Sequence, residues 1–149
     1  MNDYFFAYGT NISSEELQKH CEGAELIGFG MLNNYALEFR GYNDHAIAHL
    51  FKKKNEVLPV AVWKLPPESR YTIDNFEKFP YLYKHEKVKA IINGKKIKGI
   101  VYILKQNLPL GIPNKEYLNS LRQAYKIASF DEYYINSALE RSKIANLEK

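Results

Sequence analysis

A glycine-containing turn near the start of the chain has the residue types of an anion-binding site. Residues 4–8 are apolar and aromatic, as in a buried strand, and residues 8–11 (YGTN) lead out of them. Ser13 and Glu16 then form a capping box, which predicts the start of a helix. Unpaired backbone N–H groups at such a join can bind an anion or a carbonyl oxygen that gains negative charge. Gly9 would let a ligand approach the backbone closely, although joins of this kind are also common without a ligand.

Glu77 is the candidate for proton transfer. The sequence predicts a helix that is opened by Pro66-Pro67 and cannot continue much past Pro80. Glu77 lies at the end of this helix, beside Phe76 and Phe79. In such an apolar setting, desolvation would raise the pKa of the carboxyl group and make its carboxylate a stronger base. The alternative is an exposed glutamate that only keeps the end of the helix soluble.

Histidine and cysteine residues do not form a metal or nucleophile motif. His45 and His49 have the spacing of metal ligands on a helix, but they lie in a segment typical of a strand, so we expect partly buried or surface histidines. Cys21 is the single cysteine, which excludes an internal disulfide and a multi-cysteine metal site. The glycines in residues 28–30 lack the rest of a dinucleotide-binding fingerprint. We therefore expect neither a metal nor a cofactor.

Strand-like segments fill most of the first two thirds of the chain. They are rich in valine, alanine, isoleucine and aromatic residues, and they cover residues 24–39, 45–53, 56–65, 81–92 and 95–104. Asn33-Asn34 predicts a loop inside the first of these segments, and we expect a turn around Asn55 between the next two. Asn93-Gly94 is typical of the two-residue turn of a β-hairpin, so the last two segments should pair.

The last third of the chain has helical periodicity instead. Apolar residues recur at helical spacing in residues 114–128 and 131–147, with Asn114 and Asp131 as the predicted N-caps. Strands therefore come first and helices last, without the regular alternation of a parallel α/β fold. We expect a single domain over residues 1–149 with an α+β fold, in which helices pack on a mixed, barrel-like sheet.

Composition and charge are those of an ordinary globular protein, with 46% hydrophobic and 26% charged residues. The net charge is +4, but the lysines are dispersed and no nucleic-acid-binding motif accompanies them, so we expect no nucleic-acid partner. No apolar run approaches the roughly 20 residues that span a membrane, and the first residues lack the basic start of a signal peptide. We expect a cytoplasmic protein without membrane contact, and its oligomeric state stays open.

Four segments together resemble the γ-glutamylcyclotransferase family. They occur in the order and spacing of that family, as YFFAYGTNI at 4–12, VAVWKL at 60–65, IDNFEKFPYLY at 73–83 and PNKEYLNSL at 113–121. The resemblance covers about residues 4–140 and is closer to the small bacterial and archaeal members than to the longer animal enzymes. It implies a small closed mixed β-barrel surrounded by helices.

The resemblance also implies roles for particular residues. The family's Tyr-Gly-Ser-Asn-Leu pattern, whose backbone binds the γ-glutamyl group, is matched by Tyr8, Gly9, Thr10, Asn11 and Ile12. Its Leu-Asp-x-x-Glu-Gly pattern, which carries the catalytic acidic residue, is matched by Ile73, Asp74 and Glu77. Two later tyrosines of the family's pocket are matched by Tyr83 and Tyr117.

The implied activity is the cyclisation of γ-glutamyl amides. The α-amine of the substrate attacks its own γ-carbonyl group and releases 5-oxoproline together with an amine or amino acid. Glu77 would be the general acid and base, the turn would hold a carboxylate or oxyanion, and the tyrosines would orient the substrate. The reaction requires no metal or cofactor, and the expected partner is a small-molecule γ-glutamyl substrate.

Three residues depart from the family pattern. Thr10 replaces serine, Lys78 replaces the glycine after the acid, and His85 replaces the arginine of a Tyr-x-Arg pattern. These changes leave open which γ-glutamyl amine is the substrate. They also leave open a non-catalytic protein of the same fold that binds γ-glutamyl compounds, although the retention of Glu77 favours an enzyme.

Overall fold

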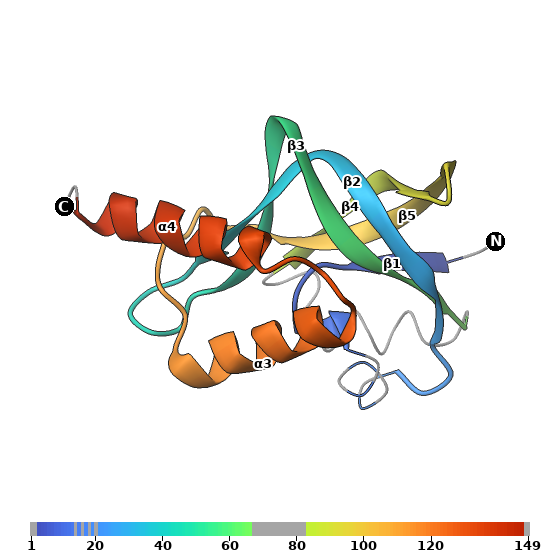
Figure 1. Ribbon diagram of the computed structural model, residues 1–149, viewed down its shortest axis with the longest axis horizontal. Helices are drawn as coiled ribbons and strands as arrows, with labels where there is room; N and C mark the ends of the chain where they lie inside the picture. Colours follow the sequence, from blue (N-terminus) through green and yellow to red (C-terminus); the bar gives the residue numbers. More distant parts are fainter. Residues whose placement is uncertain are drawn as a thin grey trace.

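The computed structural model describes residues 3–13, 15, 17, 19, 21–66 and 83–147, except for the side chains of Asp3 and Tyr83. Its strands are β1 (Asp3–Ala7), β2 (Glu25–Arg40), β3 (Ile47–Leu65), β4 (Tyr83–Ile92) and β5 (Lys95–Leu104). They close into a barrel in the order β1–β3–β2–β4–β5 (Figure 1). Paired strands are antiparallel apart from β1 and β5, which are parallel, so the barrel is mixed as predicted.

β2 and β3 form one long antiparallel ribbon that bends where the sequence predicts a loop and a turn. Asn34 and Asn55 have positive φ angles of 66° and 69°, which asparagine tolerates better than most residues. The side-chain oxygen of Asn34 accepts a hydrogen bond from the Asn55 N–H group at 3.0 Å. Pairing is interrupted between Asn33 and Tyr35 and resumes beyond them. The prediction that Asn33-Asn34 and Asn55 interrupt the strands is therefore wrong. β2 and β3 each continue through a bend that an asparagine accommodates.

The hairpin of β4 and β5 has the predicted turn. Asn93 and Gly94 connect the two strands and have φ angles of 50° and 79°. Positive φ at both central residues is what a tight hairpin turn of this length requires, and asparagine followed by glycine meets that requirement at low cost. The hairpin prediction is confirmed.

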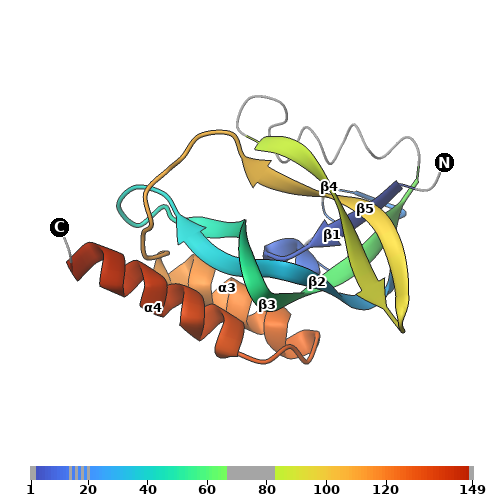
Figure 2. The ribbon, with the colours of Figure 1, turned by 90° about the horizontal axis from the view of Figure 1, so that it is seen from above.

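Two helices lie next to each other on one side of the barrel (Figure 2), namely α3 (Lys115–Ile127) and α4 (Tyr133–Leu147). The side-chain oxygen of Asn114 accepts a hydrogen bond from the Tyr117 N–H group at 2.7 Å, which caps α3. The Asp131 carboxylate accepts one from the Tyr133 N–H group at 2.7 Å where α4 begins. The predicted cap of α3 is confirmed, and Asp131 binds the first N–H group of α4 from two residues before it. Among the described helices, none is long and apolar enough to cross a membrane.

Arg141 fixes α4 to the edge of β2. Its Nη2 atom donates a hydrogen bond to the Leu37 carbonyl oxygen at 2.6 Å, and its guanidinium group lies 5.3 Å from the centre of the Phe51 ring. Leu37 is almost inaccessible to solvent, so its carbonyl group needs a partner within the protein. The last helix supplies that hydrogen-bond donor.

The centre of the barrel is closely packed around Phe6. This side chain is fully buried, and Gly99 of β5 lies directly against its ring. A Cβ atom built on Gly99 would lie 2.6 Å from Cζ of Phe6, which is too close for any real contact. The ring therefore requires glycine at this position of β5.

Gly99→Ala should lower the free energy of unfolding by about 1–3 kcal/mol, because the added methyl group forces a buried ring out of its packed position. Thermal denaturation followed by circular dichroism measures the change. Lys98→Ala, at the exposed neighbouring position, is the matched control and should melt as the wild type does. An unchanged melting temperature for Gly99→Ala would show that the Phe6 ring moves aside freely.

Candidate functional site

The turn after β1 is a short 3₁₀ helix, η1 (Thr10–Ile12), that precedes the predicted helix start. The Gly9 carbonyl oxygen accepts a hydrogen bond from the Ile12 N–H group at 3.0 Å. The indole N–H group of Trp63, a buried residue of β3, donates to the Asn11 carbonyl oxygen at 3.1 Å. These bonds hold the turn in one conformation against the barrel.

The turn presents fewer backbone donors than the sequence predicts. The Ile12 N–H group is used inside η1 and points back to Gly9. The N–H groups of Gly9 and Thr10, by contrast, donate to no other residue in the part of the chain that the structure describes. Both residues are half-buried. These two amides are therefore the part of the turn that could still bind an anion as predicted.

Tyr117 lies beside this turn although it is more than one hundred residues away in the chain. Its hydroxyl oxygen accepts a hydrogen bond from the Ala48 N–H group at 2.9 Å. A Cβ atom on Gly9 would lie 3.6 Å from Ala48 Cβ and 3.9 Å from the Tyr117 hydroxyl oxygen. The structure therefore brings together two of the predicted binding residues, and the backbone of β3 fixes the tyrosine hydroxyl.

Tyr8 is buried and its hydroxyl group points to β5. It donates a hydrogen bond to the Tyr102 carbonyl oxygen at 2.5 Å. The Tyr102 ring packs edge-to-face against Phe5 and against His85, with ring centres 5.7 Å and 4.8 Å apart. Because its proton is engaged by a carbonyl group, the Tyr8 hydroxyl would meet a ligand as a hydrogen-bond acceptor.

The remaining predicted residues lie at or beyond the edge of what the structure describes. Glu77, with Asp74 and Lys78, lies outside the described residues. Tyr83 is the first residue of β4 and pairs with Leu104, but its side chain is outside the described part. The roles of Glu77 and Tyr83 stay predictions.

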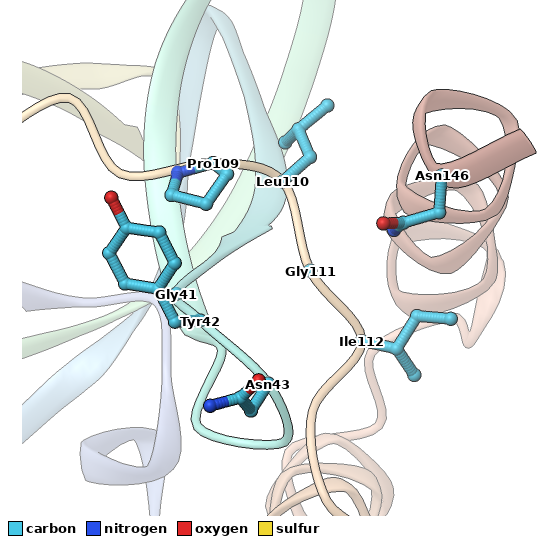
Figure 3. Close-up of a pocket in the computed structure, with 8 residues that line it drawn as sticks. All are labelled: Gly41, Tyr42, Asn43, Pro109, Leu110, Gly111, Ile112 and Asn146. Atoms are coloured by element: carbon cyan, nitrogen blue, oxygen red, sulfur yellow. The ribbon is translucent and has the colours of Figure 1, made fainter. Parts of the chain in front are cut away.

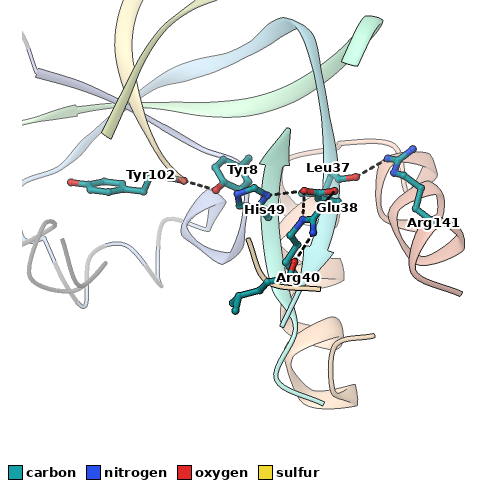
Figure 4. Close-up of polar contacts among 8 residues, drawn as sticks. Tyr8, Leu37, Glu38, Arg40, His49, Tyr102 and Arg141 are labelled. Carbon is teal, nitrogen blue, oxygen red and sulfur yellow. Dashed lines mark hydrogen bonds and ion pairs between the residues drawn. The ribbon is translucent and has the colours of Figure 1, made fainter. Parts of the chain in front are cut away.

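A buried charged cluster lies in the β2–β3 ribbon (Figure 4). Glu38 is only 4% exposed, and its carboxylate accepts hydrogen bonds from Arg40 Nε at 2.6 Å, Arg40 Nη2 at 3.2 Å and His49 Nδ1 at 2.9 Å. Burial alone would raise the pKa of Glu38, but the hydrogen bonds from His49 and Arg40, together with their charges, lower it below its ordinary value. Glu38 is therefore ionised at neutral pH.

Sequence reasoning missed Glu38 and Arg40 and treated His49 only as a partly buried or surface histidine. The signal was an acidic residue between two apolar ones, Leu37 and Phe39, in a segment otherwise typical of a buried strand. Its partner His49 becomes visible only in the cross-strand register, where the two residues lie directly opposite each other. In the described part of the chain, no group of three or more possible metal ligands occurs.

A separate hollow of about 370 Å³ lies between the loop after β2, the connection after β5 and the end of α4 (Figure 3). It is lined by Gly41, Tyr42, Asn43, Pro109, Leu110, Gly111, Ile112 and Asn146. None of these side chains is charged, and none of the predicted site residues lines the hollow. It offers no acid–base chemistry at neutral pH.

Comparison with known protein families shows which family the chain belongs to. A family model described as γ-glutamyl cyclotransferase, AIG2-like, matches residues 5–119. The chain belongs to this family. All of the predicted site residues lie within the matched span, whereas α4 lies beyond it. No match was found among proteins of curated function.

Solved structures show the same fold for this γ-glutamyl cyclotransferase-like chain. A protein named γ-glutamyl cyclotransferase is 20% identical, with a TM-score of 0.81 over 96% of this chain and 87% of its own. A human protein described as uncharacterised is 21% identical, with a TM-score of 0.80 over 95% and 86% of the two chains. A yeast γ-glutamyl cyclotransferase specific to glutathione is 14% identical, with a TM-score of 0.66 over 97% and 96%. At these identities the likeness shows the fold, and it confirms the predicted barrel with helices.

Tyr117→Phe should lower the free energy of unfolding by about 1–3 kcal/mol, because it leaves the buried Ala48 N–H group without its acceptor. Urea denaturation measures the difference. Tyr42→Phe is the matched control, since Tyr42 is 64% exposed and should tolerate the loss of its hydroxyl group. Equal stability of the two variants would mean that water replaces the Tyr117 hydroxyl at no cost.

Glu38→Gln should lower the melting temperature at neutral pH and have less effect in acid. The pKa of Glu38 is lowered by folding, so its contribution to stability is present above the ordinary value of 4.5 and is lost as the pH falls through the lowered pKa. Melting curves of wild type and variant at pH 7 and at successively lower pH test this. Glu140→Gln, at an exposed position of α4, should show no such pH-dependent difference.

Proposed function

We propose that the chain is an enzyme that cyclises γ-glutamyl amides. The α-amine of the substrate attacks the γ-carbonyl carbon of the same molecule, a five-membered lactam forms, and an amine or amino acid leaves. The products are 5-oxoproline and that amine. The observation that carries the proposal is the contact of Tyr117 with the turn at Gly9, in a chain of the γ-glutamyl cyclotransferase, AIG2-like family.

The turn would bind the negative charge of the reaction. The N–H groups of Gly9 and Thr10 are suited to hold either the α-carboxylate of the substrate or the oxyanion that forms on its γ-carbonyl group. Ile12 contributes by its hydrogen bond to Gly9, and Asn11 by its bond to Trp63, since both set the direction of the two amides. Such donors lose no free energy of reorganisation when charge develops.

The tyrosines would orient the substrate around that charge. The Tyr8 hydroxyl group, which donates to Tyr102, would accept a hydrogen bond from the substrate's amino group. Tyr117, whose oxygen is fixed by the Ala48 amide, would limit where the γ-glutamyl chain can lie. Tyr83 at the start of β4 would complete the set.

Glu77 would move the protons. A free α-amine has a pKa of about 8, so it is mostly an ammonium at neutral pH and must lose a proton before it can attack. Glu77 would take that proton as general base. The nucleophile and the carbonyl group belong to one molecule, so folding the substrate into an attack geometry supplies much of the rate and no metal or cofactor is required.

Release of 5-oxoproline from a panel of γ-glutamyl dipeptides and γ-glutamyl amines tests the proposal. Wild type should release it from at least one compound, and Glu77→Gln should lower kcat by roughly 100-fold or more while still binding that compound in calorimetry. Glu140→Gln, an exposed glutamate beyond the family's span, is the control and should retain full activity.

Two other results would change the assignment. Normal turnover by Glu77→Gln would remove Glu77 from the mechanism. Binding of a γ-glutamyl compound by the wild type without release of 5-oxoproline from any member of the panel would indicate a binding protein of this fold.

A further inference from the structure

The hairpin of β4 and β5 carries the positive charge of the whole chain. Residues 83–104 contain six lysines and one glutamate, which gives this segment a formal charge of +5, whereas the whole chain has +4. The remaining residues therefore have a formal charge of −1. A net charge that is gathered in one element creates a local positive potential, which attracts anionic partners.

Four of these lysines lie on one face of the hairpin. Lys87 and Lys89 face outward, alternating with buried residues of β4 that face the barrel interior. Lys98 of β5 pairs with Lys89, and Lys96 lies two residues before Lys98, so both belong to the same face. All four lysines are exposed. They are dispersed in the sequence and come together only in the register of the strands.

No acidic side chain balances the charge of this face. Lys89 and Lys98 lie directly opposite each other, where two like charges destabilise a sheet. None of the four lysines makes an ion pair with a residue that the structure describes. Glu86 lies on the other face, where it accepts a hydrogen bond from the Tyr35 hydroxyl group at 3.4 Å and lies 3.9 Å from Nζ of Lys52. Mixed charges would keep this surface soluble without the repulsion, so solubility alone does not account for the arrangement.

Apolar side chains continue the face onto β2. Met31 pairs with Ile91 of β4, and Ile91 pairs in turn with Lys96 of β5, so the three residues form one row across three strands. Met31 and Ile91 are both partly exposed, and Phe29, two residues before Met31, is 43% exposed. Basic and apolar side chains therefore meet solvent together. The basic–apolar face consists of Phe29, Met31, Lys87, Lys89, Ile91, Lys96 and Lys98.

We propose that the basic–apolar face binds the surface of a membrane that contains anionic lipids. The lysine ammonium groups bind the lipid headgroups, and the apolar side chains enter the boundary between headgroups and acyl chains. None of these residues belongs to the proposed substrate site, so the binding does not depend on the proposed cyclisation. A membrane-bound surface departs from the sequence prediction of no membrane contact, which considered only a spanning run and a signal peptide.

The composition of the face favours lipids over nucleic acids. It has no arginine, whose planar fork fits a phosphate, and lysine is a point charge that needs no fixed geometry. It also has no amide or hydroxyl side chain that could read the edge of a base. Lipids can move laterally to meet the lysines. Met31 and Ile91 gain from an acyl boundary and would gain nothing from a phosphate backbone.

Co-sedimentation of the full chain with vesicles tests the proposal. Wild type should bind vesicles of phosphatidylglycerol and phosphatidylcholine but not vesicles of phosphatidylcholine alone, and the binding should weaken as the salt concentration rises. Lys89→Glu should lower the affinity for the anionic vesicles by roughly 25-fold, because it removes one positive charge and adds a negative one, each worth about fivefold. The same change creates an opposite-charge pair with Lys98, so the variant should melt at or above the wild-type temperature.

Lys143→Glu is the matched control. It changes the net charge by the same amount at an exposed position of α4, and the C-terminal end of this helix lies away from the hairpin turn in Figures 1 and 2. Its vesicle binding should stay close to that of wild type. Lys98→Glu, the reciprocal change in the pair, should behave as Lys89→Glu does. Ile91→Thr keeps a β-branched side chain in the strand and should weaken vesicle binding severalfold through the loss of apolar contact.

Four other results would contradict the proposal. Binding to neither kind of vesicle, or equal binding to both, would overturn the contact with anionic lipids. Equal losses in Lys89→Glu and Lys143→Glu would show that net charge, and not this face, attracts the vesicles. Undiminished binding by Ile91→Thr would overturn the insertion of apolar side chains. Tighter binding of a labelled DNA duplex than of the anionic vesicles at the same salt concentration, lost in Lys89→Glu, would assign the face to nucleic acid instead.

Discussion

The antiparallel pairing of β2 with β3 is the constraint on which the rest of the structure depends. It sets Glu38 directly opposite His49, and it holds the bend at Asn34 and Asn55 in the same place on both strands. The outer edges of the ribbon then take up the other elements. Arg141 of α4 binds the edge of β2 at Leu37, and a tyrosine of α3 binds the edge of β3.

The proposed site uses an edge of β3 that no strand of the described residues covers. β1 pairs with β3 only at residues 61–65, so the backbone around Ala48 is left to bind other groups. Tyr117 takes the amide there and the turn at Gly9 packs beside it. The turn at Gly9, Tyr117 of α3 and the part of β3 around Ala48 are distant in sequence. They meet because β3 extends well beyond the residues that pair with β1.

Features encoded by neighbouring residues could be predicted from the sequence. Asn93-Gly94 specifies its turn through positive φ angles, and Asn114 specifies the start of α3 through one local hydrogen bond. The sequence could not show that the strand continues through Asn34, because an asparagine between two strand-like segments normally indicates a break. The strand continues here because the partner strand bends at the same place. The Glu38–His49 pair was hidden for the same reason, since cross-strand register is not a local property. The family resemblance supplied what local patterns could not, namely that the turn at Gly9 and Tyr117 lie beside each other. Their part in a substrate site and the role of Glu77 stay predictions.

The contact between Arg141 and Leu37 has a consequence for where the folding unit ends. The family's matched span stops at residue 119, within α3, yet α4 supplies a donor to the strand residue next to Glu38. The span that the family model matches is therefore smaller than the part that packs together. Substitutions that remove the Arg141 guanidinium group leave the buried Leu37 carbonyl group without this donor, so the C-terminal helix helps to hold β2 in place although it lies beyond the matched span.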